Sequence, residues 1–440
     1  MHVGPYKTGS TALQGALHRA RDELARHDAA YAGQGSRAMR AGWAVLGETP
    51  RGRHTAVDAE WSALVDDVRH KADARLCLSS EDLAMAGPDV VRRIVTDLGA
   101  DRVHVLVVAR RLDRLLPSQW QQRTQEFGTL TYDAFLHAVL DEDVPDDDPT
   151  RRTFWRSHDL ADLVGRWVAE VGGDRVTVVV ADEDDRTLLP STVERLLALP
   201  PGLLEVHGSN PSLTAAGVEL FRRLNGVAEQ RAWPDAVFAR IAKAMVGEMQ
   251  QVPRHPDDDT VRGLPAWAVD RVRHLSRERA TALLASGAVL VGDPSLVEAC
   301  DPARAAAAEP EVLRPDVVVA ALTGVVSGHR RELRRIRAGQ DPAPEPSPRA
   351  STTEETLLPD AAARRHEAAQ RLSAVFTQRS WPDGLFTRLV ERGLLKDVPG
   401  TVSAPAPTGD LAMTVEEAVA AVSAMTEASL RTLRKRSKGT

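Results

Sequence analysis

The chain has 440 residues, of which 43% are hydrophobic and 27% charged, and its formal net charge is -6. This length predicts at least two domains with sizeable cores, and the absence of a basic excess argues against nucleic acid as a partner. Cys77 and Cys300 form no C-x-x-C motif, so we expect neither a disulfide framework nor a zinc or other metal site. The sequence contains no apolar run of transmembrane length and no signal peptide, and we expect a cytoplasmic protein.

The first element is a short apolar strand, His2-Val3, followed by the glycine-rich segment GPYKTGS at residues 4–10. The segment is close to a Walker A loop, G-x-x-x-x-G-K-[ST], but Ser10 stands where that loop has its lysine, and the lysine here is Lys7. The pattern from Thr11 onward predicts a helix. Because the amides and the dipole of a helix N-terminus attract anions, this order predicts an anion-binding loop. A strand that feeds such a loop usually has about five residues, so we expect the natural chain to begin upstream of Met1.

Three further apolar segments predict strands, over Arg75–Ser79, Val103–Ala109 and Val176–Ala181. They alternate with amphipathic segments, which predicts an α/β fold with a central parallel sheet flanked by helices. Ligands of such sheets bind at the carboxyl ends of the strands. Lys7, Glu81 and Arg110 each follow a strand, so we expect these three residues at one edge of the sheet. His104 lies within a strand and is expected to be buried structure, and His158 is a weaker candidate for a base.

The second half predicts a mostly α-helical region, with no strand after about residue 210 and only a short apolar piece at 287–297. Helical spacing covers 211–246, 265–286 and 315–338. The predicted domains are an α/β domain at 1–215, a helical extension at 216–338, a Pro-rich linker at 339–360 and a second helical segment at 361–440.

The helical half contains an internal repeat, in which VAEQRAWPDAVFARI (227–241) matches VFTQRSWPDGLFTRL (375–389). The shared skeleton predicts a helix that starts at proline and is capped by aspartate, with Trp and Phe as core residues. We interpret it as a duplicated helical module. Its role is packing or, alternatively, contact with a protein partner or a second copy of the chain.

A second anion site is indicated after the strand at 103–109. Arg110 at the end of this strand and Ser118 in the following helix are separated by seven residues, and both can reach one phosphate across a strand-to-helix turn. Arg111 is a second candidate for this contact. Alone, this pair is explained as well by helix capping and a solvated serine. Together with the loop at residues 4–11, it predicts a ligand with two separate anionic groups.

The two motifs in this order resemble those of the sulfotransferases that use 3′-phosphoadenosine-5′-phosphosulfate (PAPS), and most closely their bacterial branch. The likeness covers about residues 1–215 and implies a P-loop NTPase-like sulfotransferase fold. In that family the loop binds the 5′-phosphosulfate, and the Arg and Ser of the strand–helix turn bind the 3′-phosphate. The resemblance therefore implies cofactor binding by Arg110, by Ser118 and by the loop residues Lys7, Thr8, Gly9, Ser10 and Thr11.

The resemblance also implies a reaction, the transfer of a sulfuryl group from PAPS to an acceptor hydroxyl by in-line displacement without an obligatory metal. The acceptor is a carbohydrate, a glycolipid or a small metabolite. Lys7 would stabilise charge on the leaving group, and Glu81, in LCLSSEDLA, would take the proton of the acceptor. A helix-capping role is the other interpretation of Glu81.

Two other functions stay open from the sequence. VVVADE (178–183) has the form of a Walker B strand that ends in Asp182-Glu183, as in an NTPase or kinase. Alternatively, the chain is a non-catalytic scaffold with a degenerate nucleotide fold, in which the repeated module binds a partner.

Overall fold

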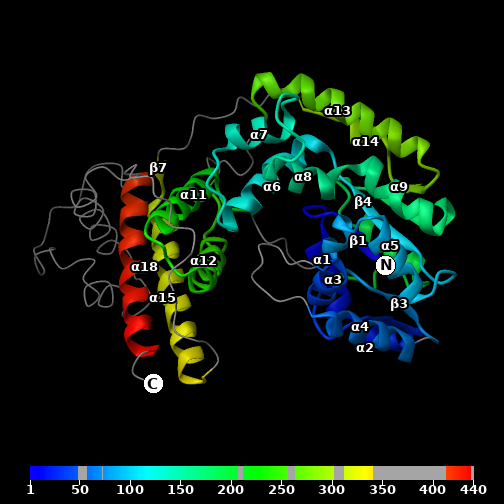
Figure 1. Ribbon diagram of the computed structural model, residues 1–440, viewed down its shortest axis with the longest axis horizontal. Coiled ribbons are helices and arrows are strands. Elements are labelled where there is room, and N and C mark those ends of the chain that lie inside the picture. The colour runs from blue at the N-terminus through cyan, green and yellow to red at the C-terminus, as the bar shows by residue number, and fades with distance from the viewer. Residues whose placement is uncertain are drawn as a thin grey trace, which may run out of the picture. The chain divides into compact units, whose positions relative to one another are not determined.

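The computed structural model describes residues 1–47, 57–71, 73–206, 212–255, 263–301, 312–339 and 413–437. It divides into two compact units, each made of segments that are separated in the sequence (Figure 1). The first unit comprises 1–119, 132–209 and 263–306, and the second comprises 120–131, 210–262 and 307–440. In the described part of the chain, no helix is both long and apolar enough to cross a membrane. The predicted domain boundaries at 215, 338 and 360 stay predictions.

The first unit is built on a parallel β-sheet. Its strands are β1 (His2–Gly4), β2 (Ala29–Tyr31), β3 (Arg75–Cys77), β4 (Val105–Ala109), β5 (Val176–Val180) and β6 (Val289–Val291). Four of them pair in the order β1-β4-β5-β6, and β2 pairs with β3. Backbone hydrogen bonds from His2 N to Leu78 O (2.7 Å) and from Ser80 N to His2 O (3.1 Å) connect the two sets. The full order is therefore β2-β3-β1-β4-β5-β6, with β1 between β3 and β4.

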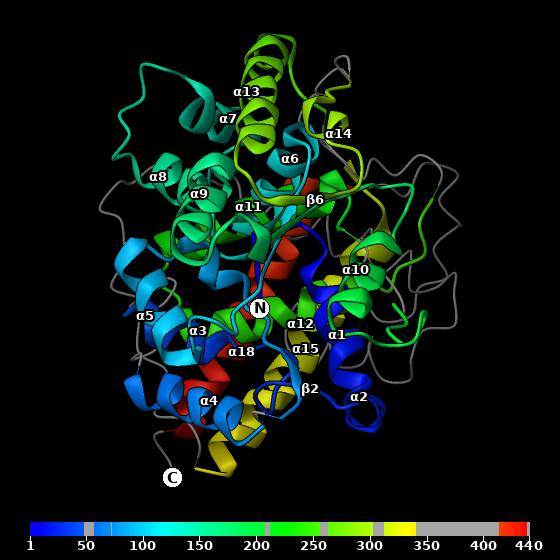
Figure 2. The same cartoon turned by 90° about the vertical axis from the view of Figure 1, so that its right-hand side faces the viewer.

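Helices cover both faces of this sheet. In chain order they are α1 (Ser10–Arg19), α2 (Arg21–Arg26), α3 (Met39–Leu46), α4 (Asp58–His70), α5 (Pro88–Leu98), α6 (Leu112–Gln125), α7 (Tyr132–Leu140), α8 (Pro149–His158), α9 (Leu160–Val171), α10 (Leu188–Leu196), α13 (Ala266–Ala285) and α14 (Ser295–Glu298). Two short 3₁₀ helices, η2 (Glu81–Met85) and η3 (Gly173–Arg175), also belong to this unit. The end of α6, from Trp120 onward, belongs to the second unit. Figure 2 shows α5 and α9 on one side of the N-terminus, where β1 begins, and α1 and α10 on the other.

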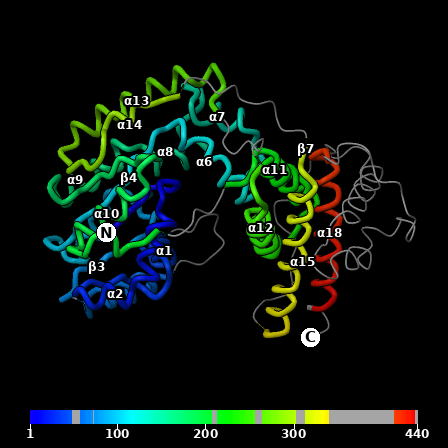
Figure 3. The backbone as a smooth tube through the Cα atoms, turned by 180° about the vertical axis from the view of Figure 1, so that it is seen from behind, coloured from blue at the N-terminus to red at the C-terminus, as the bar shows by residue number. Residues whose placement is uncertain are grey.

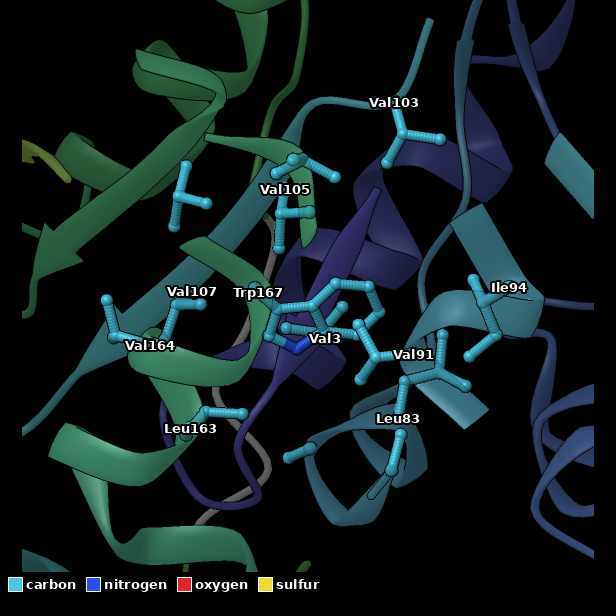
Figure 4. Close-up of a cluster of buried hydrophobic side chains, with 14 of the residues drawn as sticks. Val3, Leu83, Val91, Ile94, Val103, Val105, Val107, Leu163, Val164 and Trp167 are labelled. Atoms are coloured by element: carbon cyan, nitrogen blue, oxygen red, sulfur yellow. The ribbon is translucent and has the colours of Figure 1, made fainter. Parts of the chain in front are cut away.

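Alternate residues of the central strands supply two hydrophobic cores. Val105 and Val107 of β4 face the core under α3, α4, α5 and α9, where Trp167 is fully buried (Figure 4). Leu106, between them, faces the second core with Leu13 and residues of α2 and α10. This period of two on a doubly covered sheet explains the continuous apolar strands. The predicted α/β architecture with a central parallel sheet flanked by helices is confirmed.

The expectation that strands end near residue 210 is wrong, because β6 joins the sheet next to β5. Its sequence, VLV, is short, and Val289 is 45% exposed, as expected for an edge strand. The neighbouring glycines permit the approach. A methyl group on Gly292 would lie 2.9 Å from the carbonyl oxygen of Val180. Because β6 pairs with a strand more than 100 residues earlier in the chain, the residues around β6 carry no local pattern that would indicate this pairing.

The second unit is predominantly helical, which confirms the helical C-terminal half. Its helices are α11 (Ala215–Gln230), α12 (Asp235–Met249), α15 (Pro315–Arg337) and α18 (Val415–Ser437), and the strands β7 (Val312–Leu313) and β8 (Met413–Thr414) pair antiparallel. Gly324 and Gly328 of α15 pack directly on α12. A methyl group on Gly324 would lie 2.3 Å from Cα of Met245, so only glycine permits this separation of the helices.

The first copy of the repeat spans the end of α11 and the first half of α12. Trp233 and Phe238 are buried, and their rings pack edge to face at 5.1 Å, as predicted for core residues. The predicted cap is wrong in detail. Pro234 is the N-cap, Asp235 is the first residue of the helix, and no side chain caps it. The second copy, 375–389, lies outside the described residues.

Candidate functional site

The loop between β1 and α1 has an unusual backbone. Gly4 (φ +90°), Lys7 (φ +64°) and Gly9 (φ +98°) all lie in the left-handed region. Glycine adopts this conformation readily, whereas lysine does so at a cost in free energy. A non-glycine residue with this backbone is held by its surroundings, and such positions concentrate at functional sites. The lysine that distinguishes this loop from Walker A is thus the residue with the constrained backbone.

The C-terminal side of the loop carries a group of hydrogen-bond donors, which lie at the N-terminus of α1. In the part of the chain that the structure describes, the amides of Gly9, Ser10 and Thr11 donate to no protein acceptor. The Ser10 hydroxyl is buried and has no hydrogen-bond partner among the same residues. Helix α1 also lacks a side-chain cap. Consecutive amides at a helix N-terminus form an anion-binding arrangement.

The hydroxyls of the two threonines, Thr8 and Thr11, differ from that of Ser10 in their surroundings. Thr8 donates to the carbonyl oxygen of Pro5 (2.7 Å) and is buried, so it fixes the turn from inside. Thr11, in contrast, is exposed on the first turn of α1. The five loop residues proposed for cofactor binding therefore lie together in the structure, but their side chains have different surroundings.

Glu81 lies directly against the loop, as the strand positions predict. A methyl group on Gly4 would be 2.8 Å from Cβ of Glu81. The carboxylate is buried and held by two donors, Gln14 Nε2 at 2.7 Å to Oε2 and Arg37 Nη1 at 3.2 Å to Oε1. Ser80, the N-cap of η2, makes no side-chain cap bond. A buried carboxylate held in one orientation beside an anion-binding loop has the geometry of a positioned base.

Asp82 fastens the loop to the end of β3. Its Oδ1 accepts hydrogen bonds from the hydroxyl of Tyr6 and from Trp43 Nε1 (2.9 Å), and its Oδ2 accepts one from Ser80 Oγ (3.0 Å). Three donors therefore hold this carboxylate in place. Of the adjacent acids Glu81 and Asp82, only Glu81 lies against Gly4 itself.

Arg110 also reaches the loop. Its Nη1 donates to the carbonyl oxygen of Lys7 (2.8 Å), and its Nη2 donates to Glu183 Oε1 (2.7 Å). Its own carbonyl oxygen accepts a hydrogen bond from Arg279 Nη1 (3.2 Å). Burial lowers the pKa of the Arg279 guanidinium to about 10. Arg110 thus couples the end of β4 to the lysine of the loop.

Two more arginines follow in the same turn. Arg111 makes a two-pronged contact with Asp113 (2.8 Å for both bonds) and a third bond to Asp301 (2.9 Å). Arg114 donates to Asp301 (2.7 Å) and lies 3.6 Å from Glu183. Burial opposes the charge of Arg111, but the bonds to these carboxylates raise the pKa of its guanidinium. We call Arg110, Arg111 and Arg114 the arginine cluster, and its charge is balanced by carboxylates.

Ser118 is half-buried on α6. In the described part of the chain, neither side-chain hydrogen bond of Arg110 goes to Ser118; they go to Lys7 and Glu183. The structure therefore brings Arg110 to the loop, but Ser118 takes no part in the side-chain hydrogen bonds of Arg110. His104, predicted as structural, bonds to Thr177 Oγ1 (2.8 Å), and burial lowers its pKa. His158 is buried against Phe154, with ring centres 4.8 Å apart.

Sequence reasoning missed the residues that support Glu81 and the loop. Gln14 carries one usable signal, because it is a polar residue on the apolar face of the predicted helix. Arg37 and Trp43 lie in a segment without a chemical motif, and Tyr6 lies in the loop at a position to which the motif assigns no role; only folding brings the three to Glu81 and Asp82. Among the described residues, no group of three or more His, Cys, Asp and Glu side chains could hold a metal ion.

No protein-family model, curated protein or solved structure matches this chain.

Proposed function

We propose that the chain is a PAPS-dependent sulfotransferase. The observation that carries the proposal is the donor set at α1, next to Lys7 and to the carboxylate of Glu81. Three consecutive amides and the buried Ser10 hydroxyl there have no acceptor among the residues that the structure describes. A phosphosulfate group needs several donors and a cation at one point. A hydroxyl acceptor needs a base within reach of the same point.

The loop residues fit the anionic end of PAPS. The amides of Gly9, Ser10 and Thr11, together with the Ser10 hydroxyl, would bind the sulfate and phosphate oxygens. Lys7 would stabilise the negative charge that develops on the leaving phosphate. When bound, PAPS supplies the sulfuryl group and leaves as 3′-phosphoadenosine-5′-phosphate (PAP). Donors that are fixed before the ligand arrives need little reorganisation during the reaction.

Glu81 would accept the proton of the acceptor hydroxyl. Its Oε2 bond to Gln14 and its Oε1 bond to Arg37 fix the orientation of the carboxylate. In the overall exchange, the acceptor oxygen forms a bond to sulfur, the bond from sulfur to the phosphate oxygen breaks, and the hydroxyl proton moves to Glu81. A positioned base of this type contributes about 10²–10⁴ to the rate. The acceptor is a carbohydrate, a glycolipid or a small metabolite.

Arg110 and Ser118 are proposed to bind the 3′-phosphate of the nucleotide. In the structure the Arg110 guanidinium is bonded to Glu183 and to the loop. The 3′-phosphate would therefore replace Glu183 as the acceptor of one of these bonds. An arginine–phosphate contact is a charge-assisted bond of the same kind, so the exchange conserves the hydrogen bonding of Arg110.

The NTPase alternative is less well supported. In the sheet, β4 lies between β1 and β5, so the Asp182-Glu183 pair follows a strand that is not adjacent to the strand that feeds the loop. Glu183 is bonded to Arg110. A Walker B acid must instead be available for magnesium beside the loop, and the loop also lacks the lysine of Walker A.

Calorimetry with three nucleotides tests the proposal. We expect tight binding of PAP, weak binding of AMP and no magnesium-dependent preference for ATP. PAP and AMP differ only in the 3′-phosphate, so equal affinities would remove the second anion site. Preference for ATP with magnesium would favour the NTPase, and failure to bind any nucleotide would favour the scaffold.

A further inference from the structure

Helices α15 and α18 of the second unit end at the same place. Each has 23 residues, and each directly follows a strand of the antiparallel β7–β8 pair. Their starting points are therefore adjacent, and the two helices pack against each other. Figure 3 shows them side by side, and Figure 1 shows the C-terminus at the shared lower end. Two parallel helices of equal length bring their last turns together.

The last turns of both helices are strongly basic. Helix α15 ends in RRELRRIR (330–337), with five arginines, and α18 carries RTLRKR (431–436), with four cations. Eight of these nine side chains are exposed, and Arg335 is half-buried. We call these nine residues the basic pole. They form it in a protein whose net charge is -6, so the rest of the chain is acidic.

On each of the two helices, the carboxylate nearest in sequence to the cations of the basic pole is engaged in ion pairs. Glu332, the acid within the α15 segment, is buried and bonded to Arg240 of α12 through both oxygens (2.7 and 2.6 Å). Glu427 of α18 is shared between Arg231 and Arg431. Glu332 is therefore engaged with an arginine outside the basic pole, whereas Glu427 pairs with Arg431 of the pole as well as with Arg231.

The helix dipole explains only part of the pattern. Cations in the last turn stabilise a helix because they interact with its partial negative charge, but this effect falls off within that turn. The arginines of α15 extend over two turns, and the cations of the two helices also repel each other. The clustering of exposed cations at two adjacent helix ends is therefore a surface suited to a polyanion.

We propose that the basic pole binds the surface of an anionic lipid bilayer. Clusters of four to eight Lys and Arg on a helix end are typical of segments attracted to acidic phospholipids. Arginine forks also match the geometry of phosphate headgroups. Nucleic acid fits less well, because neither segment contains an aromatic side chain for base stacking, and the pole is formed by helix ends and not by a helix face that enters a groove. The proposal does not depend on the sulfotransferase activity.

Sedimentation with vesicles tests this proposal on the full chain. We expect binding to phosphatidylcholine vesicles that contain about 30% phosphatidylglycerol, and loss of binding without the anionic lipid or when salt is raised well above about 0.1 M. Equal binding to neutral vesicles would contradict the electrostatic mechanism. Tighter binding to a short DNA duplex than to the anionic vesicles would overturn the choice of partner.

Three charge-neutralised variants locate the surface. The triple variant Arg434→Gln, Lys435→Gln, Arg436→Gln should lose about 100-fold in vesicle affinity. The triple variant Arg331→Gln, Arg334→Gln, Arg337→Gln of α15 should lose a similar amount, since both helices form one surface.

The matched control changes three exposed arginines of the first unit, Arg26→Gln, Arg69→Gln and Arg92→Gln, which removes the same charge. It should retain vesicle affinity within about 2-fold. Loss in the α18 variant alone would reduce the site to a basic tail and overturn the joint surface. An equal loss in the control would show that net charge, and not the basic pole, drives binding.

Discussion

The loop at residues 4–11 and the arginine cluster after β4 are both candidate anion sites, but they differ in how their donors are satisfied. In the described part of the chain, the amides of Gly9, Ser10 and Thr11 have no protein acceptor. The guanidiniums of the cluster, in contrast, are bonded to the carboxylates of Asp113, Glu183 and Asp301 or to the loop carbonyl of Lys7.

This difference predicts different energetics for the two sites. A ligand that accepts from these three amides gains hydrogen bonds without displacing an acceptor of the described part of the protein. A ligand at the arginine cluster must replace a carboxylate, so its net gain is the difference between two charge-assisted contacts. The loop should therefore supply most of the catalytic effect, and the cluster should mainly select among nucleotides.

The largest expected effect is at Lys7. If the loop stabilises the leaving group, Lys7→Ala should lower the rate of sulfuryl transfer by about 10²–10³. The measurement is release of PAP from PAPS in the presence of an extract that supplies acceptor hydroxyls. Lys71→Ala, outside the loop, is the matched control and should keep the rate. Retained transfer in Lys7→Ala would contradict the role proposed for this lysine.

The contact between the loop and Glu81 is tested by two glycines with similar backbones. Gly4→Ala places a methyl group 2.8 Å from Cβ of Glu81, whereas the nearest atom to a methyl on Gly9 is 3.8 Å away. Both changes strain a left-handed backbone, but only the first adds a clash. We expect Gly4→Ala to lower the free energy of unfolding by about 2–4 kcal/mol and Gly9→Ala by about 1–2 kcal/mol.

Urea denaturation of the two variants measures this difference. Equal losses would show that Glu81 does not pack on Gly4 in solution. Glu81 would then not be placed beside the loop, and its role as the base of this site would be contradicted. A larger loss for Gly9→Ala would have the same meaning.

The smallest expected effect is at Glu183. Glu183→Gln removes the charge that competes for Arg110, so PAP affinity should rise by about 2–5-fold while AMP affinity stays the same. The control is Asp184→Asn, which makes the same charge change one residue away on the exposed loop. A rise in both variants would indicate a general electrostatic effect. A fall in Glu183→Gln would show that this carboxylate supports the site and does not compete with the ligand.

Much of the first unit could be predicted because its signals are local. The apolar runs that form β4 and β5 and the amphipathic pattern of α9 follow from one stretch of sequence each. The strand β2, with the sequence AAY, and the edge strand β6, with the sequence VLV, could not be predicted, because three residues are too short a segment to specify a strand until a neighbour pairs with their backbone. Within the site, the position of Glu81 near the loop followed from the common edge at which the carboxyl ends of parallel strands lie. Its contacts with Gln14 and Arg37 did not.

The sequence by itself therefore determined the strand–loop–helix arrangement around Lys7, the parallel α/β character of the first unit and the helical character of the second, since hydrophobic periodicity and glycine placement are properties of short segments. Only the tertiary structure decided which partners these segments meet. In the folded chain, Arg110 donates to Lys7 and Glu183, and the buried carboxylate of Glu81 accepts hydrogen bonds from Gln14 and Arg37. The basic ends of α15 and α18 lie next to each other. These contacts span long sequence separations, and their energies depend on burial and distance, which no local pattern encodes.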